Sequence, residues 1–462
     1  MDKNFKIAGG HRDTVESAKN ILESGGNAFD AAISGVFSSM VCEYLYTGAA
    51  SGGAMLVKKN GGDPSLIDFF VETPKANKKD VKDFKTIYAD FGDTKQEFSI
   101  GAGSVGIPGT LPGLIEIHGR YGSLPFSVLL EQAIDLSKKG SVLSNNQGYL
   151  SSVLSPVISN SSSLLSLFNK NGRPLRAGEK FVNKDLGGFL EQFLYQENIA
   201  SFYKNEVCSL FYDSLKFGGI ISLEDLKNYS PKTRVPLRVR CFGSDIFMNP
   251  APSTGGRLIA GGLKSLSASK NISNLEIERA LYGVESLKTE DLVGSTTHLT
   301  VIDNEKNVAS VTTTNGVGAG FLIPKTGIMP NNMLGEKHLN PYGFHGWKSK
   351  QRIPSNICPT IIVGSEGELI ALGSAGSSRI ISAIISVTAN LLGKKMSLFD
   401  AVSNPRIHLE GNVLHCEPGS LEKNYKTKDP VLWGEKNMYF GGVNACSLTE
   451  SVGDERRDGF SV

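Results

Sequence analysis

Residues 294–336 read GSTTHLTVIDNEKNVASVTTTNGVGAGFLIPKTGIMPNNMLGE. In this stretch, HLTVID and VASVTTT stand on either side of a turn at Asn304–Asn307, and this pattern predicts a β-hairpin. Threonine is a good strand former, so the threonines alone indicate no more than two ordinary strands. Whether the hairpin carries chemistry depends on the segments that accompany it along the chain.

The part of the chain before the hairpin carries mostly helical patterns. Asp13 and Glu16 have the spacing of a capping box at the start of a helix, and Gly25-Gly26 is expected to end that helix. A second helix is predicted over residues 28–45. Glycine-rich and apolar stretches then predict two strands, within residues 48–56 and 66–74.

After the hairpin, we expect a second pair of strands and an apolar helix. Residues 358–363 and 369–373 flank a short turn and indicate another hairpin. Ser377 or Ser378 is expected to cap a buried helix that runs to Gly393. Helices in the first half of the chain and paired strands in the second predict sheets covered by helices, which is an α+β fold.

The composition is that of an ordinary globular protein, with 40% hydrophobic and 20% charged residues in a chain of 462. The formal net charge is +2, and no long block of lysine and arginine indicates binding to nucleic acid or to an anionic membrane. The amino end, MDKNFKIAGGH, has no continuous apolar run. We therefore expect no signal peptide and a cytoplasmic protein. The most apolar stretch, residues 380–392, is too short to span a bilayer.

Cysteines and histidines give no support for a metal site or for a disulfide framework. The six cysteines lie far apart, and no CxxC occurs, so we expect buried thiols. The seven histidines are dispersed without an HExxH or HxH pattern. We expect no metal and no other cofactor.

Short motifs rich in glycine, proline and threonine are spread along nearly the whole chain. They are GGNAFDAAIS (25–34), SGGAML (51–56), GIPGTLPGLIEIHGRYGSLP (106–125), GGIISLEDLKNY (218–229), NPAPSTGG (249–256), STTHLTVID (295–303), TGIMPNNM (326–333), CPTIIV (358–363), GSAGSSRI (373–380) and NPRIH (404–408). In sequence and in order, these motifs resemble those of the γ-glutamyltranspeptidase family. So many motifs in one order are highly specific.

The resemblance implies the four-layer αββα fold of N-terminal-nucleophile hydrolases. It also implies that the chain cuts itself before the first threonine of the TTH motif, between Ser295 and Thr296. The products would be a helix-rich large subunit, residues 1–295, and a small catalytic subunit, residues 296–462. These two subunits would remain intertwined as a heterodimer.

A threonine suits this chemistry. Its hydroxyl can attack the preceding carbonyl, move the chain from nitrogen to oxygen and lose the resulting ester to water. The freed α-amine of Thr296 has a reference pKa of about 7.7–8.0 and can act as the base for the same hydroxyl. The β-branched side chain also restricts the hydroxyl to few rotamers. One residue thus supplies both nucleophile and base.

The resemblance assigns further residues to the catalytic centre. Thr314 corresponds to the threonine that hydrogen-bonds the nucleophile, with Thr313 as a stand-in because TTTNG is one residue shorter than the usual pattern. Asn315 resembles the asparagine that helps to bind the glutamyl group. The oxyanion hole would come from the backbone N–H groups of Gly376 and Ser377.

The expected substrate pocket departs from the family pattern. Val71 stands where the family carries an arginine that binds the α-carboxylate of the glutamyl group, and losing that bidentate partner weakens recognition by kilocalories. Glu336 is the acidic residue for the substrate's α-amine. Ser355 and Asn356 replace the family's pair of serines.

Five other side chains are open to more than one interpretation. Arg352 or Arg379 could replace the missing arginine, although Arg379 could equally be a structural residue that binds carbonyls. His298 shares a strand face with the nucleophile but is better explained as a structural histidine. His345 and Trp347, on a loop, either line a pocket or pack against it.

Three functions are consistent with these residues. The leading hypothesis is hydrolysis or transfer of γ-glutamyl amides similar to glutathione, with water or an amine as acceptor. The second hypothesis keeps Thr296 but changes the acyl group, giving an acylase of non-glutamyl amides. The third, a binding protein that is never processed, is disfavoured because the nucleophile, its partner and the oxyanion segment are all present.

Overall fold

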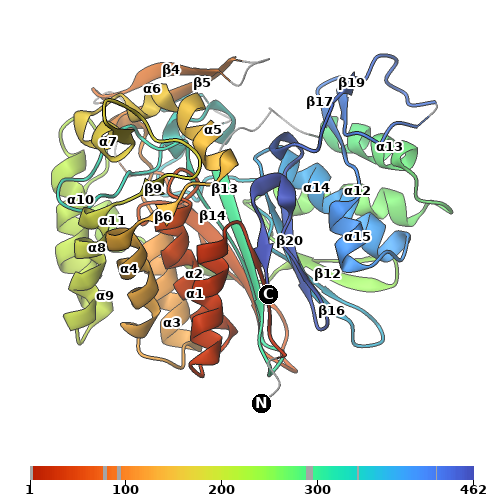
Figure 1. The fold of residues 1–462 in the computed structure, drawn as a ribbon, viewed down its shortest axis with the longest axis horizontal. Coiled ribbons are helices and arrows are strands. Elements are labelled where there is room, and N and C mark those ends of the chain that lie inside the picture. The colour runs from red at the N-terminus through yellow and green to blue at the C-terminus, as the bar shows by residue number, and fades with distance from the viewer. Residues whose placement is uncertain (1–3, 76–80, 91–94, 288–294, 341–342, 423) are drawn as a thin grey trace.

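The computed structural model describes residues 4–75, 81–90, 95–287, 295–340, 343–422 and 424–462. Two β-sheets lie face to face, and helices cover the outer face of each sheet (Figure 1). The protein therefore has the four layers, helix, sheet, sheet and helix, that the resemblance to the γ-glutamyltranspeptidase family implies.

The first sheet has seven strands, and the predicted hairpin lies near its centre. Strands β13 (Ser295–Ile302) and β14 (Val308–Gly316) pair antiparallel and are buried along their whole lengths. A strand covered on both faces exposes no side chain, so the threonines of this hairpin must find hydrogen bonds inside the protein. The strand order is β10 (Lys232–Arg234), β3 (Ser65–Phe69), β2 (Gly52–Lys58), β14, β13, β1 (Lys6–Gly9) and β22 (Phe460–Ser461).

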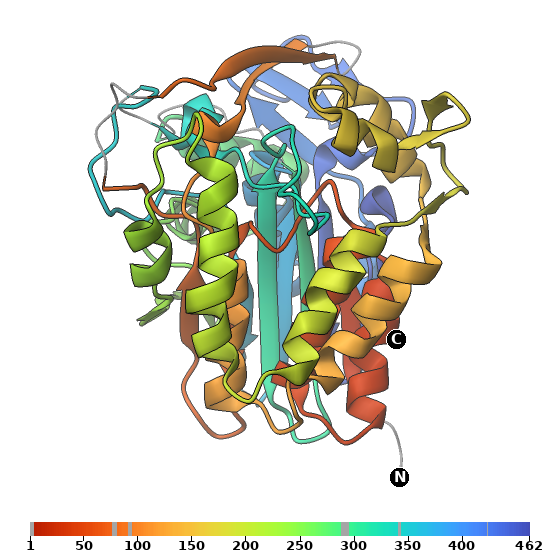
Figure 2. The ribbon, with the colours of Figure 1, turned by 90° about the vertical axis from the view of Figure 1, so that its left-hand side faces the viewer.

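Helices cover the outer face of the first sheet (Figures 1 and 2). Helix α1 (Arg12–Glu23) is capped by His11, whose ring accepts a hydrogen bond from the backbone N–H of Asp13 at 3.0 Å. The capping box predicted at Asp13 is therefore wrong, because that residue lies inside the helix. Asn27 caps α2 (Ala28–Cys42). The same layer contains α3 (Thr110–Tyr121), α4 (Glu131–Lys139), α8 (Lys184–Glu191), α9 (Ile199–Phe202), α10 (Cys208–Leu215) and α11 (Leu223–Asn228).

The second sheet has six strands and is built around the second predicted hairpin. The order is β11 (Leu237–Cys241), β12 (Ser244–Met248), β15 (Thr360–Val363), β16 (Leu369–Ala375), β20 (Gly442–Ser447) and β21 (Ser451–Val452). The apolar helix predicted after this hairpin is α14 (Arg379–Thr388), which continues as a π-helical turn to Gly393. Its layer also holds α12 (Gly255–Ser267), α13 (Asn274–Glu285) and α15 (Leu398–Ser403).

Smaller elements surround this four-layer core (Figure 1). The hairpin β4–β5 and helices α5 to α7 lie at one end of the first sheet, and a small three-stranded sheet flanks the second helical layer. These elements are β4 (Lys85–Asp90), β5 (Lys95–Ile100), α5 (Asn145–Val153), α6 (Ser155–Ile158), α7 (Ser162–Leu167), β6 (Ser141–Val142), β9 (Lys180–Phe181), β7 (Asn169–Lys170), β8 (Arg173–Pro174), β17 (Ile407–Glu410), β18 (Val413–Cys416) and β19 (Val431–Leu432).

The two predicted subunits are interleaved in both sheets. Residues 1–295 supply β1, β2, β3 and β10 of the first sheet and β11 and β12 of the second, and residues 296–462 supply nearly all the rest. In the first sheet, β13 and β14 lie between β1 and β2. The boundary at residue 295 remains a prediction, but it falls inside one shared core and not between two domains.

The thiols and helices agree with two smaller expectations from the sequence. All six cysteines are buried and free, as expected for a chain whose cysteines lie far apart. None of the helices in the described part of the chain is both long and apolar enough to cross a membrane.

Candidate active site

Thr296 lies near the start of β13, with 4% of its surface exposed. It pairs with Thr314 of β14, and the register shifts between Ser295 and Thr296, which marks a β-bulge. Bulges are common next to active sites because they re-aim a side chain. Thr296 shares its strand face with His298, because alternate residues of a strand point to the same side.

Thr314 contacts the bond that we expect to be cut. Its hydroxyl donates a hydrogen bond to the carbonyl oxygen of Ser295 and accepts one from the backbone N–H of Gly316 at 3.2 Å. Thr313 cannot substitute for it, because the Thr313 hydroxyl accepts a hydrogen bond from Thr47 at 2.8 Å on the opposite face of the strand. Of the two threonines, Thr314 is therefore the one whose hydroxyl contacts the Ser295 carbonyl.

Gly376 and Ser377 form the turn between β16 and α14, at the same end of the sheets as Thr296. Gly373 of β16 packs against the His298 ring, because a Cβ built on Gly373 would lie 2.2 Å from that ring. Three residues further along, Gly376 has a φ of 124° and Ser377 a φ of 62°. A left-handed serine costs about 1–2 kcal/mol, and such strain is often found at functional sites.

Asn315 and Glu336 approach the Ser295–Thr296 bond from the β14 side. A Cβ built on Gly316, which pairs with Ser295, would lie 2.3 Å from Oε1 of Glu336. Both Asn315 and Glu336 are buried. The Asn315 amide donates to the carbonyl of Met329 at 3.2 Å, and its Oδ1 has no hydrogen-bond partner among the described residues. This oxygen can accept a hydrogen bond from a ligand.

Ser355 and Asn356 lie at the corresponding end of the second sheet. β15 pairs Thr360 with Leu372 of β16, so the residues before Thr360 run alongside the end of β16. Asn356 accepts a hydrogen bond from Thr254 at 2.8 Å through Oδ1, and its buried Nδ2 has no partner among the described residues. The structure thus brings one unpaired acceptor, on Asn315, and one unpaired donor to this end of the molecule.

The position of the missing arginine is apolar and fully buried. Val71 has no exposed surface and belongs to a cluster with Met333, Leu339 and Trp347. The backbone of Val71 accepts a hydrogen bond from the N–H of Ile353 at 3.0 Å.

Arg352 already pairs with two carboxylates of the protein. Its Nε lies 3.5 Å from Asp68 and its Nη2 lies 3.8 Å from Glu72, with only 5% of the side chain exposed. Its guanidinium also bonds the Tyr229 hydroxyl and the carbonyl of Phe70. Burial alone would lower the pKa of Arg352, but these partners outweigh it and raise the pKa, so Arg352 is a paired structural cation.

Arg379 and His298 are also accounted for by structural contacts. Arg379 donates to the carbonyl of Tyr439 at 3.1 Å and lies over the Tyr439 ring at 4.8 Å. The two ring nitrogens of His298 lie 2.8 Å from the hydroxyls of Thr312 and Thr300. Burial lowers the pKa of His298 to about 3, so this ring stays neutral, as expected of a structural histidine.

A buried carboxyl group contacts the strand next to Thr296, and sequence analysis did not single it out. Glu43 follows α2 and accepts hydrogen bonds from Thr297 and, at 2.7 Å, from Thr14. Burial raises the pKa of Glu43 above its ordinary value, although both hydrogen bonds act in the opposite direction. In the sequence, the one indication that Glu43 is buried was its position directly after α2, a helix that is completely buried.

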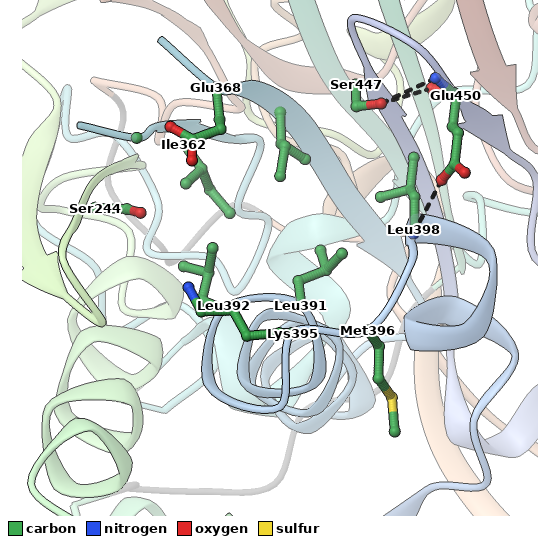
Figure 3. Close-up of a pocket in the computed structure, with 12 residues that line it drawn as sticks. Ser244, Ile362, Glu368, Leu391, Leu392, Lys395, Met396, Leu398, Ser447 and Glu450 are labelled. Carbon is green, nitrogen blue, oxygen red and sulfur yellow. Dashed lines mark hydrogen bonds between the residues drawn. The ribbon is translucent and has the colours of Figure 1, made fainter. Parts of the chain in front are cut away.

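One cavity lies beside the Val71 segment, and a second lies on the face of the second sheet that points away from Thr296. A cavity of 180 Å³ lies beside the Val71 segment and is lined partly by Leu339 and Trp347, so Trp347 does line a pocket, while His345 packs against Trp347 at 5.4 Å. A cavity of 290 Å³ lies under the π-helical turn after α14 (Figure 3). Its strand residues, such as Ile370, point to the outer face of the second sheet, away from Thr296.

A comparison with models of known families matches γ-glutamyltranspeptidase over residues 14–288 and 264–449. The chain belongs to the γ-glutamyltranspeptidase family. It is 29% identical to the acylase ACY 1 proenzyme of Pseudomonas sp. (strain V22), over 86% of this chain and 81% of that protein. It is 26% identical to the glutathione hydrolase proenzyme of Bacillus subtilis (strain 168), over 100% of this chain and 92% of that protein.

A solved structure shows the same fold. The cephalosporin acylase of Bacillus halodurans superposes with a TM-score of 0.82 at 19% identity, covering 100% of this chain and 96% of that one. Family membership makes the protein an enzyme of the N-terminal-nucleophile hydrolase class, as predicted from the motifs. Its relatives include both glutathione hydrolases and acylases, so membership alone leaves the acyl group open.

Proposed function

We propose that this γ-glutamyltranspeptidase family member is an autoprocessing amidohydrolase and acyltransferase whose nucleophile is Thr296. The observation that carries the proposal is the hydrogen bond from the Thr314 hydroxyl to the carbonyl oxygen of Ser295. That contact polarises the carbonyl next to Thr296, which is the electrophile for self-cleavage. A hydrogen bond to the oxygen that gains negative charge stabilises the transition state.

Self-cleavage proceeds through an ester. The Thr296 hydroxyl attacks the Ser295 carbonyl carbon, its proton passes to the departing amide nitrogen, and the C–N bond breaks as the C–O bond forms. Water then hydrolyses the ester and releases the carboxylate of Ser295. The products are the free hydroxyl and the free α-amine of Thr296.

The mature enzyme repeats this chemistry on its substrate. The α-amine of Thr296 takes the hydroxyl proton, the oxygen attacks the substrate amide, and the amine half leaves with a proton. The backbone N–H groups of Gly376 and Ser377 are the proposed donors to the tetrahedral oxyanion. Water or a second amine then attacks the acyl-enzyme and restores Thr296.

For the acyl group, we propose γ-glutamyl amides. Glu336 offers a buried carboxylate beside the cleavage bond, suited to a substrate ammonium group, and Asn315 and Asn356 offer the unpaired acceptor and donor described above. The glutathione hydrolase of Bacillus subtilis among the relatives supports this assignment.

A second acyl specificity is favoured by one observation. Val71 is apolar and buried, and Arg352 is held by Asp68 and Glu72, so neither of these two residues offers a free cation to a glutamyl α-carboxylate. This arrangement favours an acylase of non-glutamyl amides, and the relative named acylase ACY 1 supports an acylase activity.

Parallel assays of 4-nitroanilides separate these functions. We expect the purified protein to release 4-nitroaniline from γ-glutamyl-4-nitroanilide, and Thr296→Ala to release none. Turnover of only simple acyl anilides would replace the γ-glutamyl assignment by the acylase assignment. Failure of every anilide in processed protein would contradict the proposed activity.

A further inference from the structure

The cavity of 290 Å³ under the π-helical turn crosses the outer face of the second sheet. Ile362 of β15 pairs with Ile370 of β16, and Ile370 pairs with Ser447 of β20, so these three residues form a row across the sheet. Ser244, at the start of β12, borders the cavity at its other edge. Neighbouring strands are about 4.8 Å apart, so β12 and β20 are separated by about 14 Å. The cavity is therefore elongated, with its long direction across the strands.

The middle of the cavity is apolar on both sides. Ile362 and Ile370 form the side that belongs to the sheet, and Leu391 and Leu398 form the side that belongs to the helical layer. All four residues belong to the core of the second sheet or pack against it. This part of the cavity suits an aliphatic chain, because it offers no partner to a polar group.

One end of the cavity carries the carboxylate of Glu368. The pairing of β12 with β15 places Ser244 beside Gly364, and a Cβ built on Gly364 would lie 2.1 Å from Oε2 of Glu368. That oxygen accepts a hydrogen bond from the backbone N–H of Glu366 at 3.0 Å. The other carboxylate oxygen accepts no hydrogen bond from the described residues. Glu368 can therefore accept a hydrogen bond from a ligand.

A lysine lies at the same end of the cavity. Lys395 borders the cavity two residues after Gly393, the last residue of the π-helical turn. Gly393 packs against the ring of Phe242, since a Cβ built on Gly393 would lie 3.1 Å from that ring. Phe242 is two residues before Ser244, so this contact holds the π-helical turn beside the Ser244 end. Within the described part of the chain no carboxylate pairs with Lys395, so its ammonium can bind an anionic group of a ligand.

The opposite end of the cavity carries a second carboxylate, that of Glu450. Its Oε2 accepts a hydrogen bond from the backbone N–H of Leu398 at 3.0 Å, which fixes the carboxylate at the start of α15. Its Oε1 accepts none from the residues that the structure describes. Figure 3 shows Glu368 on one side of the cavity and Glu450 on the other, with Leu391 between them.

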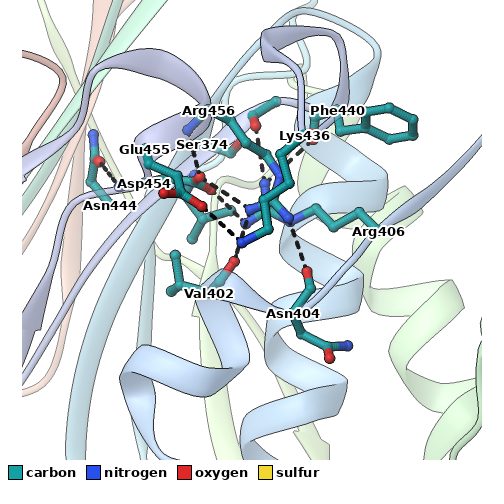
Figure 4. A network of polar contacts seen from close by, with 12 residues as sticks. Ser374, Val402, Asn404, Arg406, Lys436, Phe440, Asn444, Asp454, Glu455 and Arg456 are labelled. Atoms are coloured by element: carbon teal, nitrogen blue, oxygen red, sulfur yellow. Dashed lines mark hydrogen bonds and ion pairs between the residues drawn. The ribbon is translucent and has the colours of Figure 1, made fainter. Parts of the chain in front are cut away.

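Helix α15, which borders the cavity through Leu398, is also fixed at its far end. The carbonyl of Val402 accepts hydrogen bonds from Arg406 at 2.9 Å and from Arg456 at 3.0 Å (Figure 4). Both arginines are buried and pair with Asp454. A helix that is held at both ends leaves the cavity preformed, so a ligand does not have to order this wall when it binds.

We propose that this cavity binds a free dibasic amino acid, and that lysine is the ligand that matches it best. The carboxylate of lysine would face Lys395 and Ser244, and its α-ammonium would face Glu368. The four methylene groups would cross the apolar middle, and the terminal ammonium would face Glu450. The site thus offers one cation and two anions in the order in which lysine carries one anion and two cations, and such complementarity gives specificity. The proposal is independent of the proposed function, because the cavity lies on the face of the second sheet that points away from Thr296.

Calorimetric titration of the purified protein with lysine and three analogues tests each charged contact. Norleucine lacks the terminal ammonium, 6-aminohexanoate lacks the α-ammonium, and cadaverine lacks the carboxylate. We expect lysine to bind about 5-fold more tightly than each analogue, the effect of one partly exposed ion pair. None of these ligands carries an amide to cleave, so the titration requires no turnover. Absence of lysine binding, or equal binding of lysine and norleucine, would overturn the inference.

Substitutions at the two ends of the cavity assign the preferences to named residues. Glu450→Gln keeps an acceptor for the N–H of Leu398 and removes only the charge, so it should abolish the preference for lysine over norleucine. Lys395→Met should likewise abolish the preference for lysine over cadaverine. Lys394→Met and Glu366→Gln are matched controls, because neither side chain lines the cavity, and both should keep these preferences. Preferences that survive in the first two variants, or that are lost in the controls, would overturn the inference.

Discussion

At the scale of single residues, the proposed chemistry depends most on the Thr314 hydroxyl, because it contacts the carbonyl of Ser295. Thr314→Val keeps the shape of the side chain but removes this donor. We expect self-cleavage to slow by about 100-fold, the usual effect of losing one donor to a developing oxyanion. The measurement is the disappearance of the full-length chain on denaturing gels over time.

The neighbouring threonine provides the control for that substitution. Thr313 lies on the same strand, is also buried and bonds Thr47 on the opposite face. Thr313→Val should therefore process at close to the wild-type rate, and Thr314→Ser should process faster than Thr314→Val. Equal slowing in both valine variants would indicate a general effect on the strand and would contradict the assigned role of Thr314.

Glu43 predicts a pH dependence of stability. Burial raises its pKa from the usual 4.5 in the folded protein, so the folded state holds this proton over a pH range in which the unfolded state has lost it. The stability that Glu43 contributes is complete below about pH 4 and falls as the pH rises toward the raised value. Glutamine keeps one donor and one acceptor but does not titrate.

The stability of Glu43→Gln relative to wild type should therefore improve between pH 4.5 and pH 7. Urea unfolding of both proteins at several pH values measures the free energy of unfolding. A difference that stays constant across this range would show that Glu43 does not change its protonation on unfolding.

Sequence analysis found the residues that lie within contiguous motifs and missed those brought in by the tertiary fold. Thr296 and Thr314 belong to one hairpin, so their pairing follows from a short turn. Glu43 lies more than 250 residues before its partner Thr297, and no local pattern indicates that contact.

At the scale of elements, the turn between β16 and α14 is strained. Gly376 has a φ of 124°, and a Cβ there would lie 3.0 Å from the Cα of Gly441, which is backbone that cannot move aside easily. We expect Gly376→Ala to lower the free energy of unfolding by about 1–3 kcal/mol. Ser377→Gly relieves a left-handed serine and should raise it by up to about 1 kcal/mol. Thermal unfolding measures both, and a stabilised Gly376→Ala would contradict this description of the turn.

The longer elements could be predicted from the sequence, but their ends and the shortest strands could not. The two hairpins and the apolar helix after Ser378 follow from turns and apolar runs. The predicted start of α1 was wrong. The His11 ring caps this helix, and the spacing of Asp13 and Glu16 does not reveal that cap. Strands β1 and β22, of four and two residues, are too short to show a period and form by pairing with β13 and with each other.

At the scale of the whole molecule, the two predicted subunits share both sheets. The strand pair β13–β14 lies between β1 and β2, which belong to the other subunit. Separating the subunits would expose backbone groups and core side chains along both edges of this pair. We expect the cleaved fragments to co-elute in size-exclusion chromatography and to part only in denaturant. Free fragments under native conditions would contradict the interleaved topology.

The prediction of the layer order and the prediction of the acyl specificity rested on different observations. Composition and periodicity indicated sheets covered by helices, whereas the αββα order came from the resemblance to the γ-glutamyltranspeptidase family. The substitution by Val71 was visible in the sequence, but its consequence depended on Arg352, whose commitment to Asp68 and Glu72 is a tertiary contact. Acyl specificity therefore could not follow from motifs alone.

The most direct test of Thr296 as a self-generated nucleophile is the N-terminal sequence and intact mass of the purified protein. We expect two fragments, the second beginning at Thr296, with masses that sum to the full chain plus one water. Thr296→Ala should remain a single chain under the same conditions. A wild-type chain that stays intact after long incubation, or a second fragment that begins at another residue, would contradict this mechanism.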